Sequence, residues 1–109
     1  MNWAMRVGAV GTVVIGVATL SVSVRPEDKS AVVYKQKCVS CHGADGKGET
    51  AAGKAMKVRS FSSPETAKMS DQELADTIEK GRGKMPKYGA SMNSEDIKAM
   101  VAYVRTLAK

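Results

Sequence analysis

The residues with the most reactive side chains lie together in one short stretch, Cys38-Val39-Ser40-Cys41-His42. The chain has 109 residues and contains two cysteines and one histidine, and this stretch holds all three. Thiols at this spacing share one helical turn, so they can react with two neighbouring vinyl groups of one porphyrin, and the histidine that follows can ligate its iron. The spacing C-x-x-C-H therefore predicts covalent attachment of a c-type haem through Cys38 and Cys41, with His42 as an axial ligand.

Other chemistries of these thiols need partners that the sequence does not supply. A structural zinc ion takes four nitrogen or sulfur ligands, whereas the chain offers two cysteines and one histidine. A thioredoxin-like redox pair expects a preceding strand, and no strand is predicted before Cys38. A disulfide between Cys38 and Cys41 would close a very small loop and stabilise the fold little. An iron–sulfur cluster usually needs four thiolates, so haem attachment is the favoured interpretation.

A second axial ligand to the iron must come from a methionine, because no other histidine remains and a methionine thioether is the usual partner of histidine in electron-carrying cytochromes. The candidates after residue 26 are Met56, Met69, Met85, Met92 and Met100. Met85 lies in a glycine-rich loop and precedes Pro86, which fixes the local path of the chain. Met100 falls on an apolar helical stripe and is expected in the core. Met69 is expected to precede a helix cap, and Met56 and Met92 are expected to fill space in loops. Met56 is the alternative ligand.

Periodicity and capping signals predict three helices joined by long loops, without strands. The first helix runs from about residue 28 to 37 and leads into the cysteines. The second covers residues 70–80, opened by a Ser70–Glu73 capping box and ended by Gly81. The third starts at residue 93 or 94 and runs to the end of the chain. Its buried face is expected to contain Ile97, Met100, Val101, Val104 and Leu107.

Loops are expected over residues 43–57 and 81–92, with a short apolar element at 56–61. Loops this long in a small domain usually serve a functional site. Together with the helices they predict one folded domain over residues 26–109.

Residues 1–25 are predicted to be a signal peptide or an N-terminal membrane anchor. Arg6 precedes an uncharged apolar run at 7–24, which suits either an export segment or a bilayer-spanning helix. A buried helix of a soluble protein is disfavoured, because the run has no polar face. Either prediction places the folded domain in the periplasm, soluble or held at the outer face of a bacterial cytoplasmic membrane. Two idle free thiols would not be expected in that oxidising compartment.

From residue 28 onward the chain resembles the small class I, monohaem cytochromes c. The resemblance rests on the stretches "SAVVYKQKCVSCHG", "DGKG", "GRGKMPKYG" and "MNSEDIKAMVAYVRTL". It implies an all-α, cytochrome c-like fold, with about three helices and long loops wrapped around one covalently bound haem c. It also implies Met85 as the iron ligand opposite His42.

The resemblance carries expectations for several other side chains. Tyr34 and Tyr103 are expected to pack where the first and last helices cross. Ser30 stands where the family usually has glycine, so the crossing is expected to be close but slightly wider. The resemblance also implies a backbone carbonyl that accepts the second imidazole proton of His42, and we expect it within residues 44–54. Aromatic walls for the haem are expected from Phe61 and Tyr88, whereas Lys57 and Arg59 are expected to be solvated rather than paired with haem propionates.

The charge of the chain, +6 overall, is unevenly distributed along the sequence. Residues 35–59 carry six basic and two acidic side chains, residues 80–87 four basic ones, and residues 65–79 five acidic and one basic. The net charges are therefore +4, +4 and −4. Such a dipole would steer acidic redox proteins toward the haem edge, although simple solubility is the alternative. Binding of nucleic acid is disfavoured, because no recognition motif is visible.

These observations predict a single-electron carrier between respiratory or photosynthetic redox partners, without a small-molecule substrate or catalytic residues. The first alternative is a haem-bearing subunit fixed in a larger membrane oxidoreductase complex, which a retained apolar segment would favour. The second is a small haem peroxidase or ligand sensor. A peroxidase would need an open iron position and a distal acid–base group, and no second histidine exists to supply one.

Overall fold

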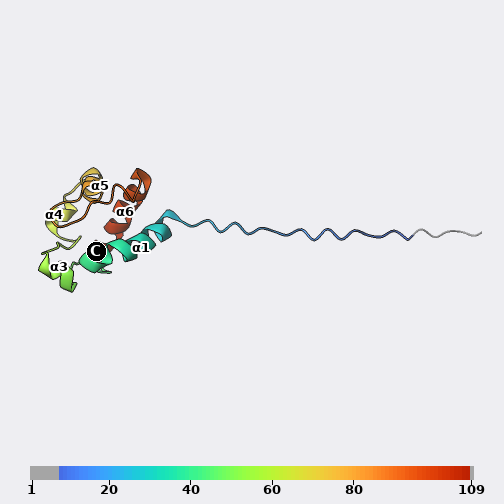
Figure 1. The fold of residues 1–109 in the computed structure, drawn as a ribbon, viewed down its shortest axis with the longest axis horizontal. Coiled ribbons are helices and arrows are strands. Elements are labelled where there is room, and N and C mark those ends of the chain that lie inside the picture. The colour runs from blue at the N-terminus through green and yellow to red at the C-terminus, as the bar shows by residue number, and fades with distance from the viewer. Residues whose placement is uncertain (1–7, 109) are drawn as a thin grey trace, which may run out of the picture.

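The computed structural model describes residues 8–108, so Arg6 of the predicted export segment lies outside the described residues. Its helices are α1 Pro26–Lys37, α2 Val39–His42, α3 Ala51–Ala55, α4 Pro64–Ala67, α5 Asp71–Lys80 and α6 Ser94–Leu107. The three long ones, α1, α5 and α6, are the predicted helices, which confirms an all-helical fold with three main helices (Figure 1). Pairing of β type within residues 8–108 is confined to one isolated bridge between Arg82 and Met85.

Helices α1 and α6 pack against each other (Figure 1). Helix α1 begins with Pro26 at its first turn, slightly before the predicted start, because proline needs no amide partner there. Tyr34 and Ser30 of α1 are buried. The ring centroids of Tyr34 and Tyr103 are 5.3 Å apart, so the predicted aromatic pair is confirmed.

The apolar stripe of α6 supplies most of the core. Ile97, Met100, Val101 and Val104 are buried and Leu107 is half-buried, as the periodicity predicts. Phe61 and Met92 complete the buried cluster from the loops.

Helix α5 lies against α6 and is fixed at both ends. The Ser70 hydroxyl accepts the Glu73 amide, and the Glu73 carboxylate accepts the Ser70 amide, so the predicted capping box is present. Gly81 ends the helix with a φ of 72°, a conformation that favours glycine. The guanidinium of Arg105, near the end of α6, donates to the Asp71 carboxylate at 3.0 Å and to the Met69 carbonyl at 2.7 Å. These bonds join the end of α6 to the start of α5.

Helix α3 lies in the predicted loop at residues 43–57, and α4 lies where no element was predicted. Thr50 caps the start of α3, and Ser63 caps the start of α4. The short element predicted at residues 56–61 is not regular: Met56 ends α3, and Lys57 adopts a positive φ of 54° that turns the chain away. That prediction was wrong because three apolar side chains spread over residues 56–61 do not specify an element.

Residues 8–25 form no helix and extend away from the helical part of the molecule (Figure 1). Within residues 8–108, no helix has both the length and the apolar character needed to cross a bilayer.

Candidate haem site

Helix α1 delivers the two thiols and the imidazole onto one turn. The Cys38 amide donates to the Tyr34 carbonyl at 2.8 Å, which closes α1. The amides of Cys41 and His42 both donate back to the Cys38 carbonyl, at 3.2 and 2.9 Å. The structure therefore brings together the three side chains that the sequence singled out, in the order that the motif predicts.

Both thiols are free and half-buried in the described part of the chain. Burial raises the pKa of Cys38, against the opposing charge of Lys37. The thiol of Cys38 is therefore protonated at neutral pH. Two separate thiols are what attachment to two vinyl groups of one ring requires.

The imidazole of His42 packs face to face with Phe61, with ring centroids 4.8 Å apart and planes inclined by 27°. Burial lowers the pKa of His42, which favours the neutral form that binds metals. Its Nδ1 atom is buried and has no hydrogen-bond partner among residues 8–108. The carbonyl expected within residues 44–54 to accept the Nδ1 proton is therefore not in place, and the Phe61 ring lies against the imidazole.

Every backbone carbonyl from residue 40 to 43 accepts a hydrogen bond from outside α2. The Thr50 hydroxyl donates to Ser40 at 2.7 Å and lies 3.3 Å from the Cys41 carbonyl. The Gly48 amide donates to His42 at 2.8 Å. The last carbonyl, that of Gly43, accepts the Tyr34 hydroxyl at 2.6 Å. We call these bonds the carbonyl clasp, and they fix the backbone that carries His42.

The backbone of Met85 is held in a tight turn. Arg82 and Met85 exchange two backbone hydrogen bonds of 3.2 and 3.0 Å, and Gly83 within the turn has a φ of 58°. A Cβ atom on Gly81 would lie 2.6 Å from the Met85 carbonyl oxygen, so the turn closes against the end of α5. The half-buried Met85 side chain thus projects from a hydrogen-bonded turn.

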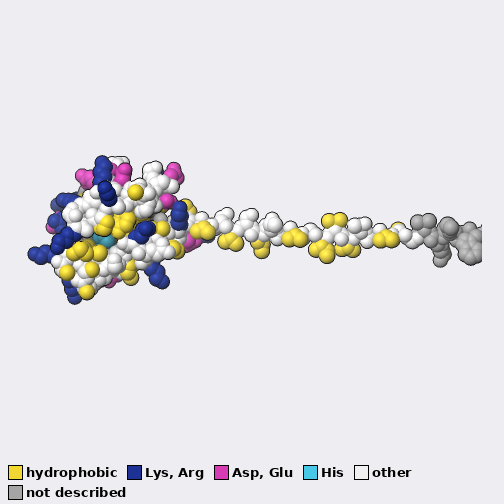
Figure 2. All heavy atoms as spheres, viewed as in Figure 1, with side chains coloured by type: hydrophobic (Ala, Val, Ile, Leu, Met, Phe, Trp, Pro, Cys, Tyr) yellow, Lys and Arg dark blue, Asp and Glu magenta, His cyan; other side chains and the backbone are white. Residues whose placement is uncertain are grey.

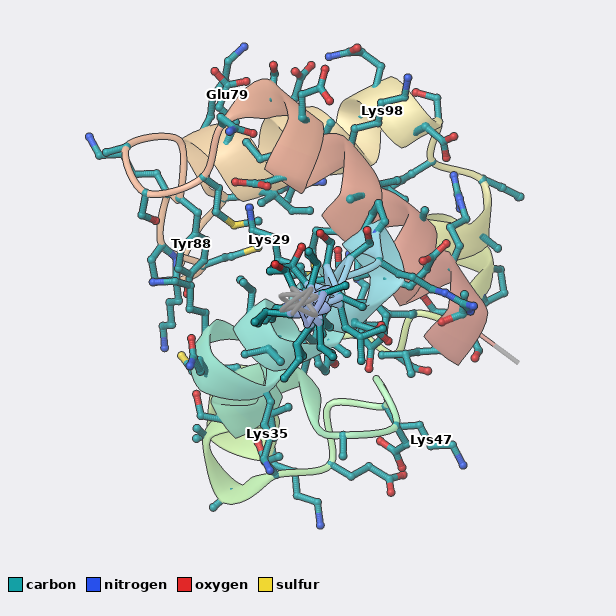
Figure 3. The ribbon with its side chains drawn as sticks, turned by 90° about the vertical axis from the view of Figure 1, so that its right-hand side faces the viewer. Lys29, Lys35, Lys47, Glu79, Tyr88 and Lys98 are labelled. Carbon is teal, nitrogen blue, oxygen red and sulfur yellow. The ribbon has the colours of Figure 1, made fainter. Side chains whose placement is uncertain are left out.

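Tyr88 ties this segment to the cysteine motif. Its hydroxyl donates to the Lys37 carbonyl at 3.1 Å, and the Lys37 ammonium lies 6.0 Å from its ring centroid. Burial raises the pKa of Tyr88, and the neighbouring Cys38 and Cys41 add to the increase. Tyr88 therefore lies close to both thiols and next to the segment that carries Met85 (labelled in Figure 3).

The other methionines have different surroundings. Met100 and Met92 are buried in the core; the former was predicted there, whereas the latter was expected to fill a loop. Met69 lines a groove of about 300 Å³ beside α5, together with Glu73 and Arg82. The half-buried Met56 ends α3, with its amide bonded to Ala52 at 3.0 Å.

The surface around His42 combines apolar and basic side chains. Figure 2 shows the histidine at the surface among hydrophobic side chains, with Lys and Arg along the adjoining edges and acidic side chains gathered at the edge nearest α5. A groove of about 240 Å³ lies elsewhere, between α1 and α6, and its lining contains neither cysteine of the motif. Lys57 and Arg59 are exposed, in agreement with their prediction as solvated charges.

The donor set fits a covalently attached haem. Two free thiols share a turn with a neutral imidazole, and an unpartnered ring nitrogen is buried at the same place. Apolar side chains surround them, and a large flat ring needs such surroundings.

The sequence of this chain is similar to those of known cytochromes. Residues 26–104 match the family profile described as "Cytochrome C oxidase, cbb3-type, subunit III". The chain is 35% identical over 83 residues to "Cbb3-type cytochrome c oxidase subunit FixP" of Bradyrhizobium diazoefficiens, an alignment that covers 72% of this chain and 27% of that protein. It is 32% identical over 79 residues to "Cytochrome c6" of Microcystis aeruginosa, covering 72% of this chain and 94% of that one.

A solved structure, "KustC0563 c-type cytochrome", superposes with a TM-score of 0.67 at 33% identity, covering 73% of this chain and 98% of its own. Fold and site together define a c-type cytochrome. The chain belongs to the cytochrome c family, with a domain of the cbb3-type oxidase subunit III kind. It is accordingly an electron carrier and not an enzyme, and its family implies covalent haem c.

Proposed function

We propose that this chain carries single electrons through one haem c, attached through Cys38 and Cys41, with His42 and Met85 as the axial iron ligands. The observation that carries the proposal is the hydrogen bond from Tyr88 to the Lys37 carbonyl, because it joins the Met85 segment to the cysteine motif. A bound haem would supply a reversible one-electron couple at its iron.

The residues of the chain set the properties of that couple. The neutral His42 imidazole is a strong nitrogen donor, and burial favours its neutral form. A methionine thioether favours the reduced state and raises the reduction potential. If His42 and Met85 both bound the iron, a substrate would have no position at which to bind, which suits a carrier.

Charge supports an acidic redox partner. The basic segments at residues 35–59 and 80–87 adjoin the motif in sequence or through Tyr88. Figure 3 shows Lys35 and Lys47 at one end of the molecule and Glu79 at the opposite end. Electrostatic steering would bring an acidic protein onto the basic end.

A haem-bearing subunit of a larger oxidase complex is the second candidate function, and the FixP similarity favours it. The chain spans only 27% of FixP, whereas it spans nearly all of cytochrome c6. Either function would place the domain in the periplasm, with residues 1–25 as a cleaved signal or a retained anchor.

Redox titration of the purified protein, followed optically, tests the proposal. We expect one reversible single-electron transition and a far-red charge-transfer band in the ferric state, which reports a methionine bound to iron. A transition that needs two electrons, or a high-spin ferric spectrum with an open iron position, would contradict it. Co-migration with oxidase subunits in native gels of detergent extracts would favour the second candidate, whereas migration alone would favour the carrier.

A further inference from the structure

The segment that carries Met85 and the segment that carries His42 belong to different packed parts of the fold. Helices α1 and α2, which lead into and through the cysteine motif, contact each other, and α1 also contacts α6. Helix α5, whose end leads into the Met85 turn, comes close to α6 but, among residues 8–108, not to α1 or α2. Contacts that cross from one part to the other therefore decide how firmly Met85 is held near the motif.

The backbone of Tyr88 belongs to the part that carries Met85. Its amide donates to the Ile78 carbonyl at 3.0 Å, and the amide of Gly89 donates to the Glu79 carbonyl at 3.0 Å. A Cβ atom on Gly89 would lie 2.9 Å from the Glu79 side chain, so this stretch runs closely along the end of α5. Tyr88 therefore has a fixed backbone three positions after Met85.

The side chain of Tyr88 crosses to the other part. Its hydroxyl donates to the Lys37 carbonyl at 3.1 Å, at the last residue of α1 and directly before Cys38. The Lys37 ammonium lies 6.0 Å from the centroid of the Tyr88 ring, at the outer limit of a cation–π contact. Tyr88 and Cys38 also pack against the same buried cluster. One side chain thus links the Met85 loop to the end of the helix that leads into the motif.

We infer that Tyr88 is a positioning residue for Met85: its hydrogen bond to the Lys37 carbonyl closes the Met85 loop onto the haem site and holds the thioether against exchange with other iron ligands. The inference rests on the proposed ligation of iron by Met85. In the open state, with Met85 off the iron and its loop moved from the motif, this hydrogen bond is broken. The bond therefore stabilises the methionine-bound state over the open state, which a purely packing role of the ring does not predict.

Binding of imidazole to the ferric, haem-loaded protein tests the inference, because an external ligand can take the iron position of Met85 only in the open state. Its apparent affinity is set by the fraction of molecules that are open. We expect Tyr88→Phe, which removes the hydroxyl and keeps the ring, to tighten imidazole binding about fivefold, the factor that the net contribution of one hydrogen bond supplies. Tyr88→Leu also removes the ring and should bind imidazole at least as tightly as Tyr88→Phe.

Tyr103→Phe is the matched control, because it removes a tyrosine hydroxyl from the aromatic pair where α1 and α6 cross. We expect this variant to keep the imidazole affinity of the wild-type protein. Met85→Ala sets the upper limit, since its iron position is open throughout, and it should bind imidazole more tightly than either Tyr88 variant. Guanidinium denaturation of each variant separates a change in folding stability from a change in ligand exchange.

A lower stability of Tyr88→Phe with the imidazole affinity of wild type would overturn the inference and leave the proposed function intact, because the hydroxyl would then serve the fold alone. Equal tightening in Tyr88→Phe and Tyr103→Phe would also overturn it, since the effect would not belong to the Met85 loop. If the wild-type protein bound imidazole as tightly as Met85→Ala, Met85 would not be an iron ligand. The proposed ligation and the inference would then both fail.

Discussion

The hydroxyl of Tyr34 donates a hydrogen bond of 2.6 Å to the carbonyl oxygen of Gly43, nine positions further along the chain. Burial is the main cause that raises the pKa of this tyrosine well above its ordinary value of 10.0. The folded state therefore keeps the proton that the unfolded state loses near pH 10. The contribution of the hydroxyl to stability is complete below that pH and is lost as the pH rises above it.

Replacing Tyr34 by phenylalanine should expose this dependence. We expect Tyr34→Phe to lower the free energy of unfolding by about 1 kcal/mol at neutral pH, and the difference from wild type should shrink above pH 10. Denaturant titrations across a pH series would measure it, with Tyr103→Phe as the control. A difference that stays constant through pH 10 and above would show that the buried hydroxyl does not titrate as described.

Replacing Met85 should remove one ligand of the iron. We expect Met85→Ala to abolish the far-red band of the ferric protein and to lower the reduction potential, because the thioether that favours the ferrous state is lost. Met56→Ala is the control, since this methionine ends α3 and is the alternative candidate. Loss of the band in Met56→Ala with retention in Met85→Ala would reverse the assignment.

Two glycines offer a matched pair: Gly81 lies directly before the turn that carries Met85, and Gly83 lies within it. Alanine at either position meets a positive φ, 72° at Gly81 and 58° at Gly83, and each should cost about 1 kcal/mol of folding free energy. At Gly81 the added Cβ also lies 2.6 Å from the Met85 carbonyl, whereas at Gly83 it meets nothing within 4 Å. Gly81→Ala should therefore cost more and weaken the far-red band. Denaturation and ferric spectra together check this, and equal effects at both positions would argue against a turn that positions Met85.

Charge reversal tests whether the basic segment at residues 80–87 steers a redox partner. We expect Lys84→Glu with Lys87→Glu to slow electron transfer to an acidic redox protein about tenfold at low ionic strength, because steering accelerates association by that order or more. Lys98→Glu is the control, because Lys98 lies on α6, outside both basic segments. Stopped-flow rates should converge at high salt, where charges are screened. Rates that respond equally to all three substitutions would indicate a net-charge effect.

The parts of the fold that the sequence predicted are those with a local signal. The Ser70–Glu73 capping box and Gly81 indicate helix α5, and the apolar stripe indicates α6. Cys38, Cys41 and His42 follow from one spacing. Helices α3 and α4 were missed, because four or five residues are too few to show a period.

The supports of His42 depend on contacts between distant segments, and a single sequence carries little signal for them. Thr50 reaches back ten positions to the Ser40 carbonyl, and Phe61 reaches the imidazole through a turn set by Gly46. A cap before a short helix was the one local clue to Thr50. The unpartnered Nδ1 could not be foreseen, because it depends on where every neighbouring carbonyl points.

A pyridine haemochrome spectrum of the purified protein after acid–acetone extraction tests whether haem is covalently attached to Cys38 and Cys41. We expect a c-type spectrum that stays with the polypeptide, and its loss from the chain in a Cys38→Ala, Cys41→Ala double variant. A haem that acid–acetone removes from the wild-type protein, or a wild-type spectrum without any haem, would contradict it.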